Sequence, residues 1–306
     1  VHVYDRYDRV GGLLVYGIPG FKLEKDVVER RAKLLADGGV TFHLNVNIGE
    51  DTTFADIREK HDAVVIATGV YKARDISMPG SGLKGIVPAL DYLTASNRKG
   101  LGDTVPEFEN GTLNADGKNV VVIGGGDTAM DCVRTAIRQG AKSVKCLYRR
   151  DRKNMPGSLR ETTNAEEEGV DFVWLSAPKA CLGDDTVTAV KAIEMHLGIA
   201  DSTGRQVPVE IDGSEFDIPC DLAIKALGFD PEDIPALFNE PGLEVSRWGT
   251  IDADPITKMT SLDGVFAIGD IVRGASLVVW AIRDGRDAAE SMDLYLKNAA
   301  REKLAS

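Results

Sequence analysis

The chain has 306 residues, of which 43% are hydrophobic and 27% charged, and its 36 Lys and Arg against 48 Asp and Glu leave a net charge of −12. This composition excludes disordered, collagen-like and low-complexity proteins, and the acidic balance argues against a protein that binds a phosphate backbone. No apolar stretch approaches the roughly 20 residues needed to cross a bilayer. We therefore expect a cytoplasmic α/β protein without nucleic-acid or membrane partners, whose length indicates two domains.

Cysteine and histidine spacing argues against a metal or redox centre. The cysteines lie at least fourteen residues apart, at Cys132, Cys146, Cys181 and Cys220, so that a CxxC pair and clustered zinc or iron–sulfur ligands are excluded. The four histidines are equally scattered, with no metal-binding spacing. We expect buried thiols and no metal site.

The predicted elements of the first third of the chain alternate between strands and helices. Residues 1–5 alternate like a strand, with no basic or apolar leader before them, so we expect an N-terminally incomplete chain. A glycine-rich turn follows, then a helix over 23–37, a strand over 41–46, a helix over 54–60 and a strand over 63–67.

Residues 96–118 lose this periodicity and predict a connection between domains. A βαβ unit follows, with strands over 119–123 and 143–148 around a helix over 127–139. The SxxE pattern at Ser158 and Glu161 predicts a capping box that opens another helix. Further strands are expected over 170–175, 187–197, 206–218, 221–227 and 264–268, and a long helix begins near Ser276.

The strongest motif is GxGxxA at Gly124, Gly126 and Ala129, between the first strand and the helix of the βαβ unit. In that context the first glycine makes a tight turn, the second lets backbone approach a pyrophosphate, and the small third residue packs helix on strand. The alternative is a glycine-rich turn without a ligand. Asp127 would repel a pyrophosphate, so we expect its side chain to face away.

Two arginines, Arg149 and Arg150, follow the second strand of this unit. NAD sites usually place an acidic residue there for the ribose hydroxyls, whereas NADP sites use basic residues for the 2′-phosphate. The pattern favours NADP. The alternative is a run of charged residues that is simply exposed to solvent at the surface.

A second, incomplete nucleotide pattern lies at the two ends of the chain. Asp5 ends the opening strand, at the ribose-binding position of a Rossmann unit, and Gly11-Gly12 follows closely. Far downstream, Gly269-Asp270 ends an apolar strand. Taken singly, each is also typical of an ordinary turn.

Together these segments resemble the small (β) subunits of bacterial NADPH-dependent glutamate synthases, over the whole chain. The resemblance is carried by YDRYDRVGGLLVYGIPGFKL (4–23), VVIATGVYKAR (64–74), VVVIGGGDTAMDCVRTAIRQGA (120–141), LYRRDRKNMPGS (147–158), IKALGF (224–229) and GVFAIGDIVRGASLVVWAIRDGRDAA (264–289). The same layout recurs in dihydropyrimidine dehydrogenase and in adrenodoxin-reductase-like proteins.

The resemblance implies two Rossmann-like dinucleotide-binding domains, with an NADPH domain inserted in a discontinuous FAD domain. The implied boundaries are 1–98 for the first part of the FAD domain, 99–115 for a connection, 116–228 for the NADPH domain and 229–306 for the second part of the FAD domain. Hydride would pass from NADPH to FAD without a catalytic side chain or a metal in this chain.

The resemblance also assigns roles by motif position. The residues implied for FAD are Asp5 at the adenosine ribose, Gly11, Gly12 and Leu13 along the flavin, Thr68 and Gly69 at the edge of the site, Gly269 and Asp270 at the ribityl and pyrophosphate, and Ser276, Leu277 and Val278 at the flavin ring. Those implied for NADPH are Gly124, Gly126, Asp127, Thr128 and Ala129 at the pyrophosphate, and Arg149 and Arg150 at the 2′-phosphate.

In that family, the electrons continue through 4Fe–4S clusters to a large FMN-containing subunit that makes glutamate. The N-terminal region that carries the cluster cysteines and the first FAD glycine turn has no counterpart in this sequence, so we expect both to lie outside it. Two other functions stay open at this point: an NADPH:ferredoxin-type reductase, and a non-catalytic fragment that only binds NADPH.

Overall fold

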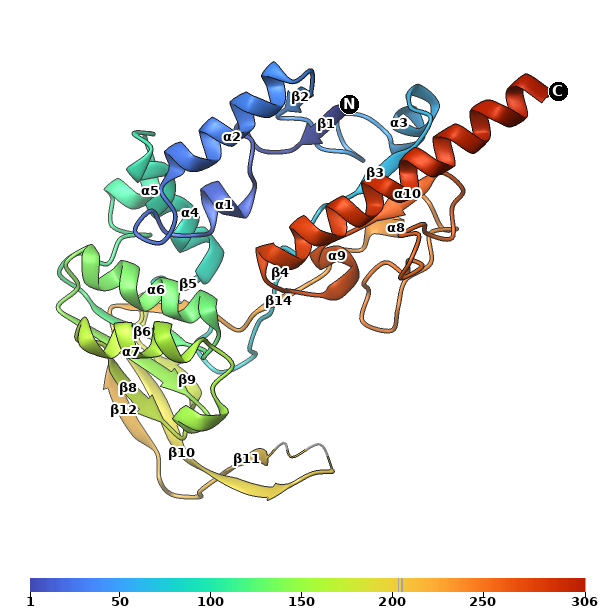
Figure 1. Cartoon of the computed structure of the whole chain (residues 1–306). Helices are drawn as coiled ribbons and strands as arrows, with labels where there is room; N and C mark the ends of the chain where they lie inside the picture. Colours follow the sequence, from blue (N-terminus) through green and yellow to red (C-terminus); the bar gives the residue numbers. More distant parts are fainter. Residues whose placement is uncertain (203, 205, 306) are drawn as a thin grey trace. The chain divides into compact units, whose positions relative to one another are not determined.

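The computed structural model describes residues 1–202, 204 and 206–305, which form two compact units (Figure 1). The first unit comprises Val1–Val10, Leu34–Arg74 and the chain from Phe229 onward. The second unit comprises Gly11–Lys33 and Asp75–Gly228. Helix α2 (Lys25–Asp37) runs from the second unit into the first. Among the described residues, no helix is long and apolar enough to span a membrane.

A five-stranded parallel sheet organises the second unit. Its strands, in order across the sheet, are β5 (Ile86–Pro88), β13 (Leu222–Lys225), β6 (Asn119–Ile123), β7 (Ser143–Tyr148) and β8 (Asp171–Trp174). The central strand β6 is apolar and buried from Val120 to Ile123, as is usual for a parallel strand that is covered on both faces.

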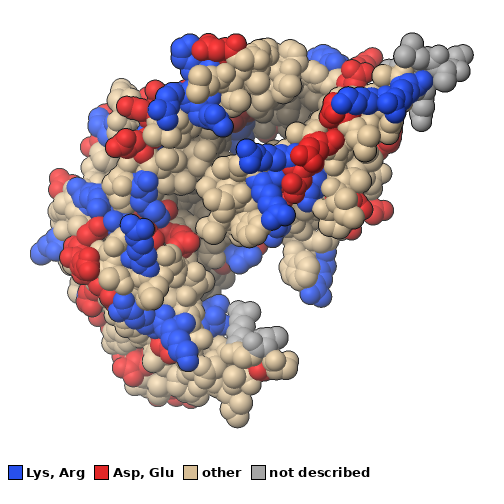
Figure 2. All heavy atoms as spheres, viewed as in Figure 1, with Lys and Arg blue, Asp and Glu red and all other residues tan. Residues whose placement is uncertain are grey.

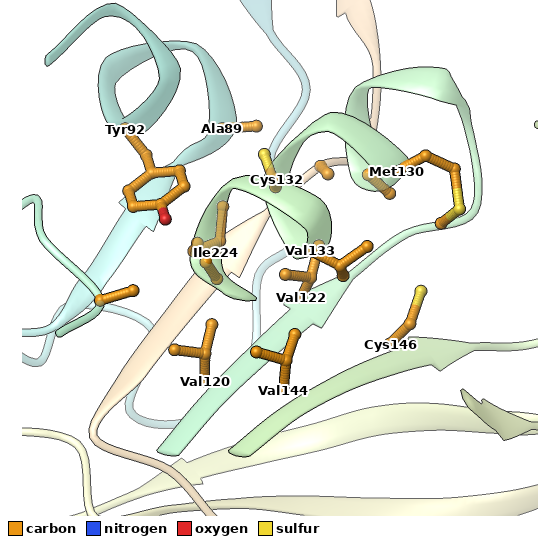
Figure 3. Close-up of a cluster of buried hydrophobic side chains, with 14 of the residues drawn as sticks. Ala89, Tyr92, Val120, Val122, Met130, Cys132, Val133, Val144, Cys146 and Ile224 are labelled. Atoms are coloured by element: carbon orange, nitrogen blue, oxygen red, sulfur yellow. The ribbon is translucent and has the colours of Figure 1, made fainter. Parts of the chain in front are cut away.

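Helices cover one face of this sheet. They are α4 (Ala89–Gly100), α6 (Asp127–Arg138) and α7 (Leu159–Glu167). Figure 3 shows the core that results, in which Val122, Val144 and Ile224 of the strands lie beneath Val133 of α6 and Tyr92 of α4. Alternate residues of the same strands point to the other face.

An antiparallel layer packs on that other face. It consists of β9 (Ser176–Leu182), β10 (Ala189–Ala200), β11 (Gln206–Glu210) and β12 (Phe216–Pro219). Val121 and Ile123 of β6 share a buried cluster with Val190 of β10 and Ile218 of β12. The short elements of this unit are α1 (Leu13–Tyr16), α5 (Pro106–Glu109) and the 3₁₀ turn η1 (Arg152–Asn154).

The first unit holds two short parallel pairs of strands and one antiparallel pair. The parallel pairs are β1 (His2–Asp5) with β2 (Thr41–Leu44), and β3 (Val64–Ile66) with β15 (Val265–Ala267). The antiparallel pair is β4 (Lys72–Ala73) with β14 (Phe229–Asp230). The helices are α3 (Phe54–Lys60), α8 (Ile234–Leu237), α9 (Asp270–Arg273) and α10 (Val278–Ala305). Phe54 and Phe238 stack in its core with ring centroids 4.6 Å apart.

The units differ from the domain boundaries expected from the sequence. Residues 75–98, expected in the first part of the FAD domain, cluster with the second unit, because β5 pairs with β13 and α4 packs on the same core as α6. Residues 11–33 cluster there too. The connection expected over residues 99–115 contains the last residues of α4 and the whole of α5. The strand after Gly264 pairs with β3 in the first unit, as the discontinuous layout requires.

The capping box expected at Ser158 and Glu161 does not form. Ser158 is the N-cap of α7, but its side chain makes no capping hydrogen bond. The Glu161 carboxylate instead pairs with Arg134 at 2.7 Å and with Lys22 at 3.3 Å. Two cations outcompete a single backbone amide for the carboxylate, because charge-assisted pairs are stronger than neutral hydrogen bonds.

Replacing Ile224 with Ala should destabilise the second unit by about 2–5 kcal/mol, because it opens a cavity in a fully buried central strand. Ile199→Ala is the matched control, since Ile199 is 96% exposed, and it should change stability by less than about 0.5 kcal/mol. Urea unfolding followed by circular dichroism measures both. Equal effects of the two substitutions would contradict the packing described here.

Candidate functional site

The turn between β6 and α6 is built from three glycines whose surroundings differ. Gly124 has φ +145°, and a Cβ there would lie 2.1 Å from the Ala226 carbonyl oxygen. A Cβ on Gly125 would lie 2.4 Å from the Tyr148 ring. A Cβ on Gly126 would meet nothing within 4 Å. The first two glycines are therefore required by packing, whereas Gly126 exposes its backbone to open space.

The start of α6 presents backbone amides at this turn. Gly126 is the N-cap and provides no side chain to accept from the first-turn amides. The Ala129 amide donates to the Gly126 carbonyl at 2.9 Å, whereas the amides of Asp127 and Thr128 precede the first i−4 carbonyl of the helix. Ala129, fully buried, lets α6 pack closely on the sheet. Amides at a helix N-terminus, with the positive end of the helix dipole, suit an anion such as a pyrophosphate.

The Asp127 carboxylate is held by the chain's own backbone. Its Oδ1 accepts a hydrogen bond from the Ser158 amide at 2.9 Å. The Gly157 amide donates to the Gly125 carbonyl at 2.9 Å, so that the loop before α7 is folded onto the glycine turn. The Asp127 carboxylate thus has a donor in the Ser158 amide, and its orientation relative to a bound anion stays a prediction.

Arg149 and Arg150 follow directly after β7, at the same sheet edge as the glycine turn. The Gly124 amide donates to Leu147 near the end of β7 at 3.1 Å, which fixes this adjacency. Arg149 is exposed and Arg150 is half-buried, with its Nε buried and lacking a hydrogen-bond partner. In the described part of the chain neither forms an ion pair, whereas Arg152 pairs with Glu166 at 2.8 Å. Two uncompensated cations therefore lie at this edge.

In the first unit, the ends of β3 and β15 bring four predicted residues to one edge. The strands are parallel and Ala267 pairs with Ile66, so that Thr68-Gly69 and Gly269-Asp270 follow side by side. The Gly269 amide donates to the Asp284 carboxylate at 3.4 Å, and this carboxylate is fixed by Arg273 at 2.5 and 2.6 Å.

Asp270 connects this edge to the start of α10. Its carboxylate accepts from the Ser276 amide, and burial raises the pKa of the carboxyl group. The next residues are apolar yet exposed, among them Leu277, Val278 and Trp280. An apolar surface beside a helix N-terminus and a half-buried carboxyl group suits a ligand with an aromatic body and hydroxyl groups.

Asp5 ends β1, which belongs to the other parallel pair of the first unit. Its carboxylate accepts from the Tyr7 amide at 2.9 Å, and burial raises its pKa. Gly11, Gly12 and Leu13 belong to the second unit, at the start of α1. The structure thus gathers the predicted NADPH residues at one edge and most predicted FAD residues at another, but assigns these three to a different unit from Asp5.

Three histidines that are far apart in the sequence meet on β1, β2 and the segment after α3. His2 Nδ1 lies 2.9 Å from His43 Nε2, and Tyr4 bonds to His61 Nε2 at 3.1 Å. Nothing in the sequence pattern indicated this cluster. Within the described ranges, no group of three or more His, Cys, Asp or Glu side chains could hold a metal ion.

The chain matches the family model of the pyridine nucleotide-disulphide oxidoreductases over residues 25–285, and it belongs to that family. Within the family it is similar to the small chains of NADPH-dependent glutamate synthase. It is 69% identical over 305 residues to the glutamate synthase [NADPH] small chain of Azospirillum brasilense, covering 100% of this chain and 63% of the relative. It is 66% identical over 300 residues to a putative small chain from Cereibacter sphaeroides, covering 98% of this chain and 72% of the relative.

Solved structures show the same fold at low sequence identity. Mycobacterium tuberculosis FprA in complex with NADPH superposes with a TM-score of 0.78 at 19% identity, covering 99% of this chain and 79% of that chain. The expected α/β class with two dinucleotide-type domains is therefore confirmed, as is the resemblance to glutamate synthase small chains.

Gly124→Ala should destabilise the fold much more than Gly126→Ala. The first places a methyl group against the Ala226 carbonyl at a positive φ and should cost about 2 kcal/mol or more. The second adds a methyl group in open space and should cost less than about 1 kcal/mol. Thermal unfolding of the two variants measures this. A lower melting temperature for Gly126→Ala than for Gly124→Ala would refute the described geometry of the turn.

Proposed function

We propose that this chain is the electron-input part of a glutamate synthase, an NADPH-dependent oxidoreductase that passes electrons from NADPH through FAD toward glutamate synthesis. The observation that carries the proposal is the glycine turn at Gly124–Gly126 with Arg149 and Arg150 at the same sheet edge. The names of its relatives in Azospirillum and Cereibacter support the same function.

NADPH would lie across the carboxyl edge of the second unit's sheet. The open space at Gly126 and the first-turn amides of α6 fit its pyrophosphate. The Arg149 and Arg150 guanidinium groups, which have no acidic partner in the described chain, fit its 2′-phosphate. Arg150 Nε is an orphaned buried donor, and such a group is expected to have an acceptor in the working state of the protein.

FAD would be held by the first unit. Asp5 would accept from its ribose hydroxyls, and Thr68, Gly69, Gly269 and Asp270 would border the ribityl and pyrophosphate groups. The α10 start at Ser276, Leu277 and Val278 would direct amides and apolar surface to the flavin ring. A proposed contact of Gly11, Gly12 and Leu13 with the flavin stays a prediction.

The chemistry asks the side chains for binding and orientation. Bound flavin supplies the acceptor for the hydride of the nicotinamide, and the protein sets their orientation and polarity. The α10 N-terminus would stabilise negative charge on the ring beside it. No side-chain acid or base is required for this transfer.

The family's name includes disulphide chemistry, but the cysteines of this chain do not support it. All four are buried and free. Burial raises the pKa of Cys146 to about 12 and that of Cys220 to about 12, so that both stay as unreactive thiols at neutral pH. We therefore favour flavin reduction by NADPH with onward transfer to another electron carrier.

The electron acceptors would lie outside this chain. The chain spans 63% of the length of the Azospirillum relative, and we propose that 4Fe–4S clusters and a large FMN-containing subunit receive the electrons in the assembled enzyme. On the face shown in Figure 2, Lys and Arg are interspersed with Asp and Glu. A ferredoxin would favour a continuous basic surface.

Changing both Arg149 and Arg150 to Ala should weaken NADPH binding by about 10²-fold, because each charge-assisted hydrogen bond contributes roughly 1.5–3 kcal/mol and solvent screens part of it. NADH affinity should stay nearly constant. Arg152→Ala is the matched control, because Arg152 already pairs with Glu166, and it should leave both affinities unchanged. Fluorescence titration with NADPH and NADH measures all three proteins.

The same variants test the activity. With FAD added under anaerobic conditions, NADPH should bleach the flavin absorption of the wild-type chain much faster than NADH does. The double variant should lose this preference and the Arg152 variant should keep it. NADPH binding without any bleaching would contradict the proposed reaction and leave a protein that only binds the nucleotide.

A further inference from the structure

A cavity of about 320 Å³ lies in the second unit between the segment after α1, helix α4 and the end of α6. Its volume is in the range of small-molecule pockets. Thr135, which lines it, belongs to the last turn of the 12-residue helix α6, whereas the glycine turn precedes the first. A helix of that length spans about 18 Å, so the cavity is distinct from the proposed NADPH site.

Lys25 brings a half-buried ammonium group to this cavity without an acidic partner. Its Nζ donates to the Leu14 carbonyl at 2.9 Å and to the Ile18 carbonyl, and no ion pair joins it to any residue that the structure describes. Lys22, one turn earlier, pairs with Asp131 at 2.7 Å and with Glu161 at 3.3 Å. Buried charges are normally paired. The Lys25 ammonium therefore lacks a counter-ion.

Thr135 also lines this cavity and carries an unsatisfied hydroxyl group. It is 5% exposed, and its buried Oγ1 has no hydrogen-bond partner. Ser96 adds a second hydroxyl, which accepts from Gln139 Nε2 at 3.0 Å and keeps its own proton for donation. One N–H of Lys25 and the O–H groups of Thr135 and Ser96 therefore have no hydrogen-bond acceptor among the described residues.

The rest of the lining combines apolar side chains, the amide side chains of Asn97 and Gln139, and Arg138. Phe21 and Leu93 form apolar walls. Arg138 stacks on Phe21, with its guanidinium carbon 3.8 Å from the ring centroid, and is paired with Glu168 at 2.6 Å, so that Lys25 is the cavity's cation without an ion pair in the described chain. None of the side chains that line the cavity is acidic. An occupant that satisfies these groups needs a negatively charged acceptor at one end and an apolar body at the other.

We propose that this cavity is a binding site for a small carboxylate with an apolar body, whose carboxylate pairs with Lys25 and accepts from the Thr135 hydroxyl. The site is independent of the proposed reaction with NADPH. Its ligand, a small apolar carboxylate, differs from the nucleotide that we propose for the glycine turn and the two arginines.

The charge state of Lys25 gives the site a pH dependence. Burial lowers its pKa to about 8, against the attraction of Asp131 on α6. Around it, Arg138 on α6 is paired with Glu168 at 2.6 Å, Lys22 is paired with Asp131, and the α4 residues at the cavity are neutral. A bound carboxylate favours the charged ammonium, so affinity should be highest below pH 8 and fall by up to tenfold per pH unit above it.

Calorimetric titration of the whole chain with benzoate, against its neutral analogue benzamide, tests the proposal. Benzoate should bind at least tenfold more tightly than benzamide, since a charge-assisted pair is lost with the amide. Lys25→Met should abolish this preference and Lys25→Arg should keep much of it. Thr135→Val, which keeps the shape and removes the hydroxyl, should weaken benzoate several-fold. Lys142→Met, at an exposed lysine of the same unit, is the matched control.

Three outcomes would overturn the proposal: no saturable binding of benzoate, equal binding of benzamide, or benzoate binding that Thr135→Val and Lys25→Met leave unchanged. Each would mean that the cavity holds only water. Circular dichroism first shows which variants fold, because Lys25 also bonds to the carbonyls of Leu14 and Ile18. If Lys25→Met does not fold, Thr135→Val and the decline in affinity above pH 8 decide the question. NADPH affinity should be unchanged in all folded variants.

Discussion

The second unit depends on the close approach of the Gly124 backbone to the carbonyl of Ala226. A Cβ at this position would lie 2.1 Å from that oxygen, and the Ala226 amide donates back to the Ile123 carbonyl at 2.9 Å. The turn is closed on its other side by the Tyr148 ring, which leaves no room for a side chain at Gly125. Strands β6, β7 and β13 can therefore end at one edge only with glycines at the turn.

The sheet edge at which β6, β7 and β13 end determines where the groups proposed to bind NADPH lie. Because β7 ends beside the turn, the two arginines after it are held near the first-turn amides of α6 by backbone geometry alone. The Asp127 carboxylate is neutralised in part by the Ser158 amide, so the positive character of the edge is kept. The far end of α6 contributes to a separate cavity, where Lys25 lacks the acidic partners that Lys22 has. Helix α6 thus borders both proposed sites, one at each end.

The sequence predicted the parts of the molecule that local pattern determines. The strands at 119–123 and 143–148 have the expected bounds, and α6 ends one residue early, because apolar runs, glycine stops and the βαβ period are local signals. The paired edges at Thr68 and Gly269 were accessible only through the resemblance, since 200 residues of chain separate them and no periodicity reports such pairing.

Long-range contacts account for what sequence reasoning missed. Residues 75–98 join the second unit through pairing of β5 with β13, which no local pattern shows. The capping box failed because Glu161 contacts Lys22 and Arg134. The bond between Lys22 and Asp131 joins residues 109 positions apart. The histidine cluster and the cavity at Lys25 likewise arise from tertiary packing.

We propose that the edge beside Gly126 selects a nucleotide by its 2′-phosphate. Calorimetric titration of the unmodified chain with adenosine 2′,5′-bisphosphate and with adenosine 5′-monophosphate isolates that phosphate from the nicotinamide and the flavin. The bisphosphate should bind at least tenfold more tightly and should be displaced by NADPH. Equal affinities for the two nucleotides would contradict it.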